Sequence, residues 1–331
     1  MQRWTLDPNS PDWQASPEVE SVCGVLLNGE LAAIPTETVY GLAADATNGI
    51  TCAKIFEAKG RPQFNPLISH VASVAAAEEH AEFSDEARAL ADAFWPGPLT
   101  LVLPKKRSSP ICDLATAGLD TVALRVPDGP VMRLLSERTG KPLAAPSANT
   151  SGKISPTRAE DVIADLAKSL SYVIDAGPCS VGIESTIVGL TDETPRLLRP
   201  GGISREDIEQ VLGSRLQGAP ESMRPDAPSA PGMLSSHYAP NARMILNVSE
   251  ASAEDALLSF GPERLPGADK ARAEFNLSPR GDLAEAASNL FTAMRALDAA
   301  GTGSIRVQFI PSLGLGEAIN DRLQRAAAPR I

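Results

Sequence analysis

The sequence contains few of the residues that mark several common classes of protein. Its 331 residues include only four cysteines, which are far apart and form no C-x-x-C pair. We therefore expect neither a zinc site nor a disulfide framework, and a reduced, cytoplasmic compartment fits this pattern best. No apolar run approaches the ~20 residues of a membrane-spanning helix, and residues 1–13 lack the apolar core of a signal peptide. The net charge of −11 argues against a broad nucleic-acid-binding surface.

Two stretches of ordinary globular composition flank a segment of different character. The chain is 43% hydrophobic and 21% charged. Its length suggests two domains, since single cores rarely grow beyond about 250–300 residues. From 214 to 241 the sequence is rich in Pro, Ser, Gly and Ala without an apolar period, which is typical of a linker. We expect an α/β domain over 1–213, a linker over 214–241 and a smaller, Rossmann-like α/β domain over 242–331.

Apolar runs that alternate with helical patterns predict a mixed sheet with flanking helices. In the first domain, strands are expected at 31–34, 66–71, 99–104, 121–127, 142–146, 171–177, 184–190 and 195–201. Helices are expected between Ser16 and Gly29 and at 48–58, 73–81, 84–94, 130–139, 157–168 and 204–213. In the second domain, strands are expected at 242–248, 272–277 and 304–310, and helices near 251–259 and at 282–299 and 315–327. No strand precedes G-x-G-x-x-G and no Walker A motif is present, so a nucleotide site would use neither phosphate loop.

Residues 57–70, EAKGRPQFNPLISH, gather basic and polar side chains on a stiff segment. Lys59 and Arg61 are two apart, so in an extended segment they would point the same way. Gly60 would let a ligand approach the backbone, while the two prolines hold the loop stiff. Two cations fixed on one face suit a polyphosphate better than a single carboxylate. The alternative is a solvated basic loop.

Further polar residues accompany buried strands elsewhere. Ser147 and Asn149 follow the strand at 142–146 and would offer donors and acceptors on one side of an extended segment. Thr121 and Arg125 share one face of an apolar strand. An arginine there needs a partner, which is either an anionic ligand or a carboxylate of the protein itself.

Seven motifs lie between Pro35 and Gly202 in the order and spacing of the YrdC-like threonylcarbamoyl-adenylate synthases, which the chain resembles. They are PTETVYGL, KGRPQFNPLISH, WPGPLT, ALRVP, PSANTSGKISPT, GIESTIV and LLRPGG. HYAP and the segments near the end of the chain resemble the two-domain form of this family. The resemblance implies a twisted mixed sheet with flanking helices around a concave basic cavity. It also implies synthesis of threonylcarbamoyl-adenylate and pyrophosphate from ATP, L-threonine and bicarbonate. A partner transferase would then modify the adenosine beside the anticodon of tRNA, with weak tRNA contact possible here.

The resemblance assigns site residues by their matching positions. ATP contacts are expected from Arg61, Asn65, Thr121, Ser147, Ser155, Arg199 and Tyr238. L-threonine contacts are expected from Thr38, His70, Arg125, Ala145 and Ser185, with Arg125 on the carboxylate, His70 positioning the substrate and Ala145 acting through its backbone. A tetrad of Lys59, Arg61, Ser147 and Asn149 is expected to be catalytic without a covalent intermediate. Mg²⁺ is expected with ATP, but no carboxylate cluster identifies a metal site held by the protein.

The chain departs from the family pattern at two places. Gly129 stands where relatives often carry histidine, and residues 234–236 (LSS) replace basic residues that are usual before HYAP. Tyr238 nevertheless favours an active-site lid over 220–241, with a plain linker as the alternative. Two other functions are considered. An RNA-binding module is disfavoured by the net charge, and a hydrogenase-maturation carbamoyl-transfer protein by the absence of its cysteine motifs.

Overall fold

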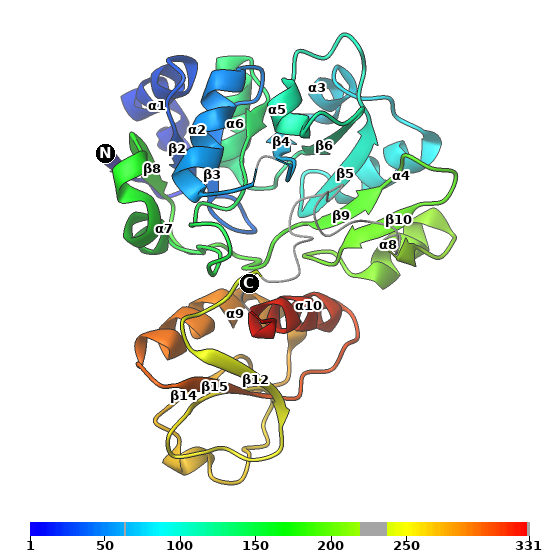
Figure 1. Cartoon of the computed structure of the whole chain (residues 1–331). Coiled ribbons are helices and arrows are strands. Elements are labelled where there is room, and N and C mark those ends of the chain that lie inside the picture. Colours follow the sequence, from blue (N-terminus) through cyan, green and yellow to red (C-terminus); the bar gives the residue numbers. More distant parts are fainter. Residues whose placement is uncertain (63, 219–236, 330–331) are drawn as a thin grey trace.

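Two separate β-sheets organise the chain in the computed structural model, which describes residues 1–62, 64–218 and 237–329 (Figure 1). Within these residues the first sheet is mixed and has 11 strands, in the order β1-β8-β2-β3-β7-β4-β6-β5-β9-β10-β11. In that order the strands are Gln2–Thr5, Tyr172–Asp175, Ala32–Ile34, Gly41–Asp45, Leu143–Ala144, Ile68–His70, Thr121–Arg125, Leu99–Pro104, Thr186–Gly189, Arg196–Arg199 and Gln217–Gly218. This sheet confirms the predicted fold class.

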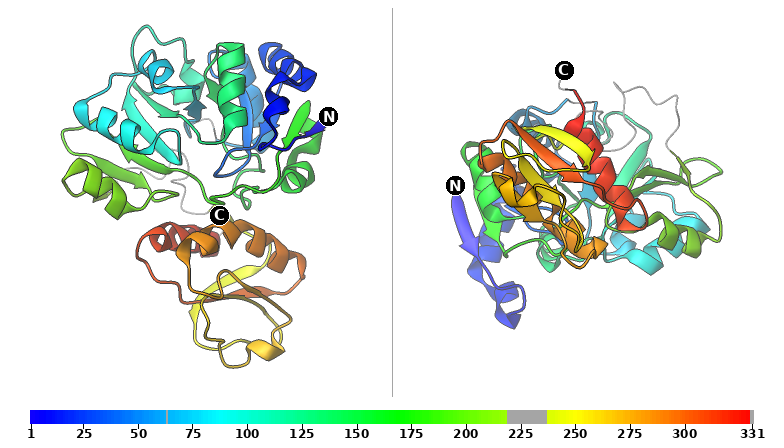
Figure 2. Two further views of the ribbon diagram at one scale, coloured as in Figure 1. Left: turned by 180° about the vertical axis from the view of Figure 1, so that it is seen from behind. Right: turned by 90° about the horizontal axis from the view of Figure 1, so that it is seen from below.

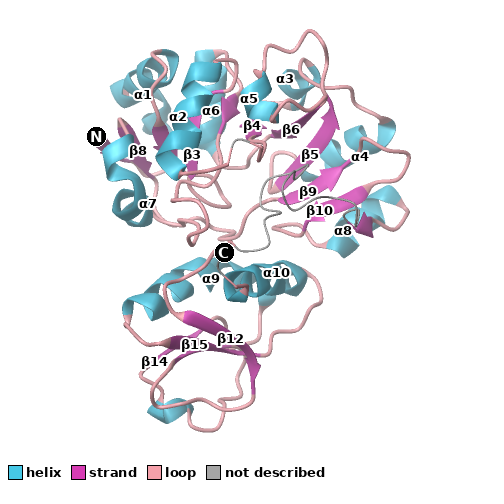
Figure 3. Cartoon of the chain, viewed as in Figure 1, coloured by secondary structure: helices cyan, strands magenta, loops and turns pink. Residues whose placement is uncertain are grey.

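Helices surround this sheet and bury its faces (Figure 3). They are α1 (Pro17–Leu27), α2 (Gly49–Lys59), α3 (Val74–Glu78), α4 (Asp85–Phe94), α5 (Asp113–Thr116), α6 (Pro130–Thr139), α7 (Ala159–Leu166) and α8 (Arg205–Leu212). Helix α1 packs against α6, α2 against α5, and α4 against α8. The predicted helices and strands of this domain are confirmed with small differences at their ends. The structure adds β1, β3, α5 and β11, which the sequence did not predict.

The second sheet is parallel throughout, in the order β12-β15-β13-β14. Its elements are β12 (Arg243–Val248), β13 (Ala256–Ser259), β14 (Ala273–Asn276), α9 (Leu283–Ala299), β15 (Ser304–Gln308) and α10 (Leu315–Ala327). The helix predicted near 251–259 is wrong, because this stretch contains strand β13. All four residues of β13 are buried between two neighbouring strands, and a fully buried strand has no alternating pattern to distinguish it from a helix.

The second domain packs its helices against the first. Figures 1 and 2 show α9 and α10 on the side of the second sheet that faces the first domain. Val39 and Ile183 of the first domain belong to the same buried apolar cluster as Phe291 of α9. The two backbones nearly touch at Gly182, where an added Cβ would lie only 2.4 Å from Cα of Ser288. The interface therefore reaches the segment that carries the GIESTIV motif.

Candidate active site

A cavity forms where residues of the first domain meet His237 and Tyr238, near the end of the segment that connects the two domains. It is lined by Thr36, Thr38, Val39, Gly41, Arg61, Ile68, His70, Arg125, Ala145, Pro146, Ser147, Glu184, Ser185, Arg199, His237 and Tyr238. Nine of these were predicted as site residues: Thr38, Arg61, His70, Arg125, Ala145, Ser147, Ser185, Arg199 and Tyr238. The topology thus brings most of the predicted substrate contacts to one place.

The segment around Lys59 was predicted to be extended, but this prediction is wrong because Lys59 is the last residue of helix α2. Asn48 caps the start of α2 by accepting from two backbone N–H groups. Gly60 ends α2 in the left-handed conformation with φ +59°, and the Arg61 N–H then bonds the Phe56 carbonyl at 2.9 Å. Glycine is the residue best suited to this cap. Gly60 therefore serves the turn that separates Lys59 from Arg61.

The predicted tetrad comes together through backbone groups. The buried Lys59 Nζ donates to the carbonyls of Ser147 at 2.6 Å and Asn149 at 2.5 Å. The chain turns there, with the Asn149 N–H bonded to the Ser147 carbonyl at 3.0 Å, so the extended segment predicted for Ser147 and Asn149 is also wrong. Ser147 lines the cavity, whereas the Asn149 amide donates to the carbonyls of Thr150 and Lys153. Lys59 therefore fixes the turn that presents Ser147.

Arg61 brings a buried positive charge to the cavity without a carboxylate partner among the described residues. Its Nη2 donates to the Pro66 carbonyl at 3.0 Å and its Nε lies 3.4 Å from the Asn65 carbonyl. Burial, and then the charge of Arg199, lower the pKa of Arg61 to about 10. Both amide atoms of the fully buried Asn65 also find no hydrogen-bond partner in the described parts of the chain. Such groups are costly unless a ligand satisfies them.

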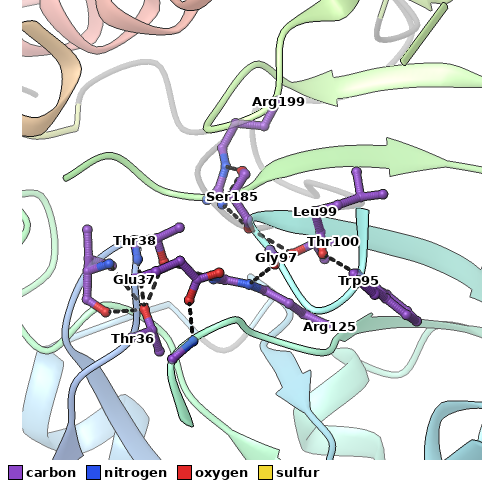
Figure 4. Close-up of polar contacts among 12 residues, drawn as sticks. Thr36, Glu37, Thr38, Trp95, Gly97, Leu99, Thr100, Arg125, Ser185 and Arg199 are labelled. Carbon is purple, nitrogen blue, oxygen red and sulfur yellow. Dashed lines mark hydrogen bonds and ion pairs between the residues drawn. The ribbon is translucent and has the colours of Figure 1, made fainter. Parts of the chain in front are cut away.

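Arg125 also lines the cavity, and unlike Arg61 it has a carboxylate partner, Glu37 (Figure 4). Its Nη2 donates to Glu37 Oε1 at 2.6 Å, its Nη1 to Thr38 Oγ1 at 2.9 Å, and its Nε to the Gly97 carbonyl at 3.1 Å. Burial raises the pKa of the Glu37 carboxyl, but Arg125 and nearby backbone N–H groups outweigh burial and leave this pKa below its usual value. Each terminal nitrogen of Arg125 has one further N–H for a ligand.

His70 and Ser185 are two further residues that were predicted to contact threonine, and both are held by hydrogen bonds within the protein. His70 pairs in register with Arg125 across β4 and β6, and its Nδ1 lies 3.3 Å from the Leu143 carbonyl. Burial, and then Arg125, lower the pKa of His70 to about 3. The ring is therefore neutral at pH 7, with Nδ1 as the donor and Nε2 as an acceptor. Ser185 Oγ lies 2.7 Å from Thr100 Oγ1 and 3.1 Å from Arg199 Nη2 (Figure 4).

Five predicted site residues do not line the cavity: Lys59, Asn65, Thr121, Asn149 and Ser155. Thr121 begins β6, and at about 3.3 Å per residue it lies about 13 Å along the strand from Arg125, which ends β6. Ser155 lies behind the lining residue Glu184, to which its hydroxyl donates at 2.5 Å. The substrate contacts of these residues stay predictions.

The sequence interpretation missed Glu37, Glu184 and His237, although all three lie within quoted motifs. It also missed Arg322, which reaches Glu184 from α10. A buried arginine within a polar motif requires a carboxylate, and that requirement could have identified Glu37. Residues 219–236, which include most of the predicted lid and the departures at 234–236, lie outside the described residues.

No group of three or more His, Cys, Asp or Glu side chains within residues 1–62, 64–218 and 237–329 could hold a metal ion. Among the helices in those ranges, none is long and apolar enough to span a bilayer.

The chain is similar to known proteins along both domains. A family model described as "Telomere recombination" for Sua5, YciO and YrdC proteins matches residues 24–201, and one described as "Threonylcarbamoyl-AMP synthase, C-terminal domain" matches 203–328. The threonylcarbamoyl-AMP synthase of Bacillus subtilis is 38% identical, covering 99% of this chain and 98% of that protein. That of Pyrococcus abyssi is 42% identical, covering 95% of each. A crystal structure of P. abyssi Sua5 complexed with L-threonine aligns with a TM-score of 0.88 at 38% identity, covering 99% of this chain and 98% of that one.

Proposed function

The chain belongs to the threonylcarbamoyl-AMP synthase family, and we propose on that premise that it makes threonylcarbamoyl-AMP and pyrophosphate from ATP, L-threonine and bicarbonate. It is thus an enzyme of the nucleotidyltransferase type, with ATP as a substrate. The observation that carries the proposal is the cavity. Among the described residues, Arg61 has no carboxylate partner there, and two N–H groups of Arg125 have no hydrogen-bond acceptor. These two arginines suit the phosphates of ATP and the carboxylate of threonine respectively.

Threonine binding is assigned to the Arg125 side of the cavity. The two remaining N–H groups of Arg125 can hold the substrate carboxylate with two parallel bonds. The neutral His70 ring presents Nε2 as an acceptor for the amine or hydroxyl of threonine, so it positions the substrate and does not act as an acid. Thr38, Ser185 and the backbone of Ala145 complete this side.

The reaction requires positioning and charge neutralisation, without a covalent intermediate on the protein. The neutral threonine amine attacks bicarbonate, or carbon dioxide formed from it by loss of water, to give a carbamate. The bicarbonate carbon stays in the carbamate, and one bicarbonate oxygen leaves as water together with the proton lost by the amine. A carbamate oxygen then attacks the α-phosphorus of ATP. The bond to the bridging oxygen breaks, and pyrophosphate departs with that oxygen. Arg61 and Arg199 neutralise the phosphates, while Lys59 holds the turn that carries Ser147.

This function is tested by measuring pyrophosphate release from ATP with each co-substrate omitted in turn. We expect release only when L-threonine and bicarbonate are both present, with AMP-level products appearing at the same rate. Orthophosphate as the first phosphate product, or release independent of threonine, would contradict the proposed reaction. Salt-dependent RNA binding without turnover would instead support the RNA-binding alternative, which the net charge of −11 disfavours.

ATP binding is expected to take up protons. Burial, and then the charge of Arg61, hold the pKa of Lys59 well below its ordinary value, and burial lowers the pKa of His237 to about 3. A nearby polyphosphate raises both pKa values. ATP binding therefore favours the protonated forms of both side chains, and the affinity for ATP should increase as pH falls. Calorimetry at pH 7 in buffers of different ionisation enthalpy should show net uptake. Uptake that persists in His237→Gln comes from Lys59, and buffer-independent heats would contradict this prediction.

Several finer assignments belong to the same proposal. Mg²⁺ would enter with the phosphates of ATP, since the described residues offer no cluster that fits a metal held by the protein. A downstream transferase would carry the threonylcarbamoyl group to tRNA, in the cytoplasm, and weak tRNA contact by this chain is possible. We also retain the division into a catalytic domain over 1–213, a connecting segment over 214–241 and a second domain over 242–331.

A further inference from the structure

A buried ion pair joins the second domain to the wall of the cavity. Arg322, on α10, is fully buried, and its Nε lies 3.0 Å from Oε2 of Glu184, which lines the cavity. The Arg322 Nη1 also donates to the Pro200 carbonyl at 2.7 Å and to Asp321 at 2.8 Å. Its charge thus reaches first-domain groups from the second domain.

The other oxygen of Glu184 fixes a residue expected to contact ATP. Oε1 accepts from the Ser155 hydroxyl at 2.5 Å. Burial raises the pKa of Glu184, but the charges of Arg322 and then Arg199 outweigh burial and leave it below its usual value. Glu184 is therefore an ionised acceptor that holds Ser155 in one orientation. A hydroxyl that donates to Glu184 can only accept from a ligand.

Arg322 also lies against the aromatic ring of Tyr238. The guanidinium carbon is 5.4 Å from the ring centroid, and the ring stacks on Phe291 of α9 at 5.4 Å. Tyr238 has a φ of +61°, a strained conformation for a residue other than glycine, which persists only where its surroundings enforce it. The second domain supplies those surroundings through Phe291 and Arg322.

Stability alone does not explain why the Arg322 guanidinium is buried between the two domains. The buried Nη2 of Arg322 finds no hydrogen-bond partner among the described residues. Buried ion pairs often contribute less to stability than well-packed apolar side chains of the same volume, and an unsatisfied donor adds a further cost. This cost favours a role for the guanidinium beyond holding the two domains together.

We propose that Arg322 is a positioning residue for ATP, which acts through the Glu184 carboxylate on Ser155 and directly on the Tyr238 ring. This inference rests on the proposed function and gives the second domain a part in it, as a wall of the ATP site. Arg125, which is expected to hold the threonine carboxylate, does not bond Arg322: among the described residues its hydrogen-bond partners are Glu37, Thr38 and Gly97 of the first domain.

The test compares Arg322→Met with a matched arginine at the same interface. Arg205 on α8 donates to Glu317 of α10 at 2.6 Å, bridging the same two domains away from the cavity lining. Calorimetry should show ATP binding at least tenfold weaker in Arg322→Met, with the threonine dissociation constant changed less than twofold. Arg205→Met should bind both ligands within twofold of the unsubstituted protein. Arg322→Lys should recover part of the ATP affinity, since it keeps a charge beside Glu184.

A double variant keeps the test decisive if the single one fails to fold. Glu184→Gln combined with Arg322→Met removes both charges, so no buried carboxylate is left alone, and it should fold while still binding ATP at least fivefold more weakly. Equal ATP losses in Arg322→Met and Arg205→Met, or parallel losses of ATP and threonine affinity, would overturn the proposal. The dissociation constants of ATP and threonine are measured at equilibrium, so the result does not depend on whether the enzyme turns over. ATP binding without threonine-dependent pyrophosphate release in the unsubstituted protein would contradict only the proposed function.

Discussion

Replacing Arg61 by methionine should lower kcat/KM for ATP about a hundredfold, because hydrogen bonds to charged groups contribute roughly 1.5–3 kcal/mol each. Among the described residues the Arg61 guanidinium donates only to the carbonyls of Asn65 and Pro66. The fold therefore does not require the charge, and burial disfavours it. We expect Arg61→Met to unfold at a temperature equal to or above that of the unsubstituted protein.

The controls for this prediction separate charge from geometry. Arg61→Lys keeps a positive charge but loses the planar fork, so it should recover only part of the activity. Arg107→Met removes an exposed arginine far from the cavity lining and should change kcat/KM by less than twofold. An Arg61→Met enzyme that retains a third or more of its kcat/KM for ATP would show that Arg61 does not bind the phosphates.

Most of the fold could be predicted because the strands and helices of this chain have clear periods and caps. The failures occurred where tertiary pairing determines the structure. Strand β3 (GLAAD) has glycine and alanine where β-branched residues are usual, and its pairing with β2 and β7 makes it a strand. Strand β13 (ALLS) is buried on both faces, so its sequence cannot be told from part of a helix.

Nine residues that line the cavity could be predicted from motifs, but the hydrogen-bond partners of these residues could not. The family that the motifs indicated is confirmed by the relatives and by both family models. Glu184 and Arg322 are 138 positions apart on different domains, and no spacing rule connects them. The position of Lys59 at the end of a helix could have been predicted, since a lysine followed by glycine after a helical stretch is a common helix end. The extended interpretation overlooked that signal.

Arg125→Met should lose both stability and threonine binding, and the two losses have different causes. Without Arg125, the Glu37 carboxylate stays buried and unpaired, and breaking a buried ion pair in this way costs about 3–5 kcal/mol. Threonine binding should weaken at least tenfold, because the charge-assisted bonds to the substrate carboxylate are lost. ATP affinity should change far less, since no partner of Arg125 belongs to the expected ATP contacts.

A second substitution separates these causes. Glu37→Gln in the Arg125→Met background removes the buried, unpaired carboxylate. The double variant should therefore regain most of the free energy of unfolding that Arg125→Met loses, as measured by denaturation in urea. Threonine affinity should not recover. Threoninol, which lacks the carboxylate, serves as the matched ligand. The unsubstituted protein should prefer threonine to threoninol at least tenfold, while the double variant should bind the two almost equally. If the double variant regains threonine affinity together with stability, then Arg125 acts by pairing with Glu37, and the substrate carboxylate is held elsewhere in the cavity.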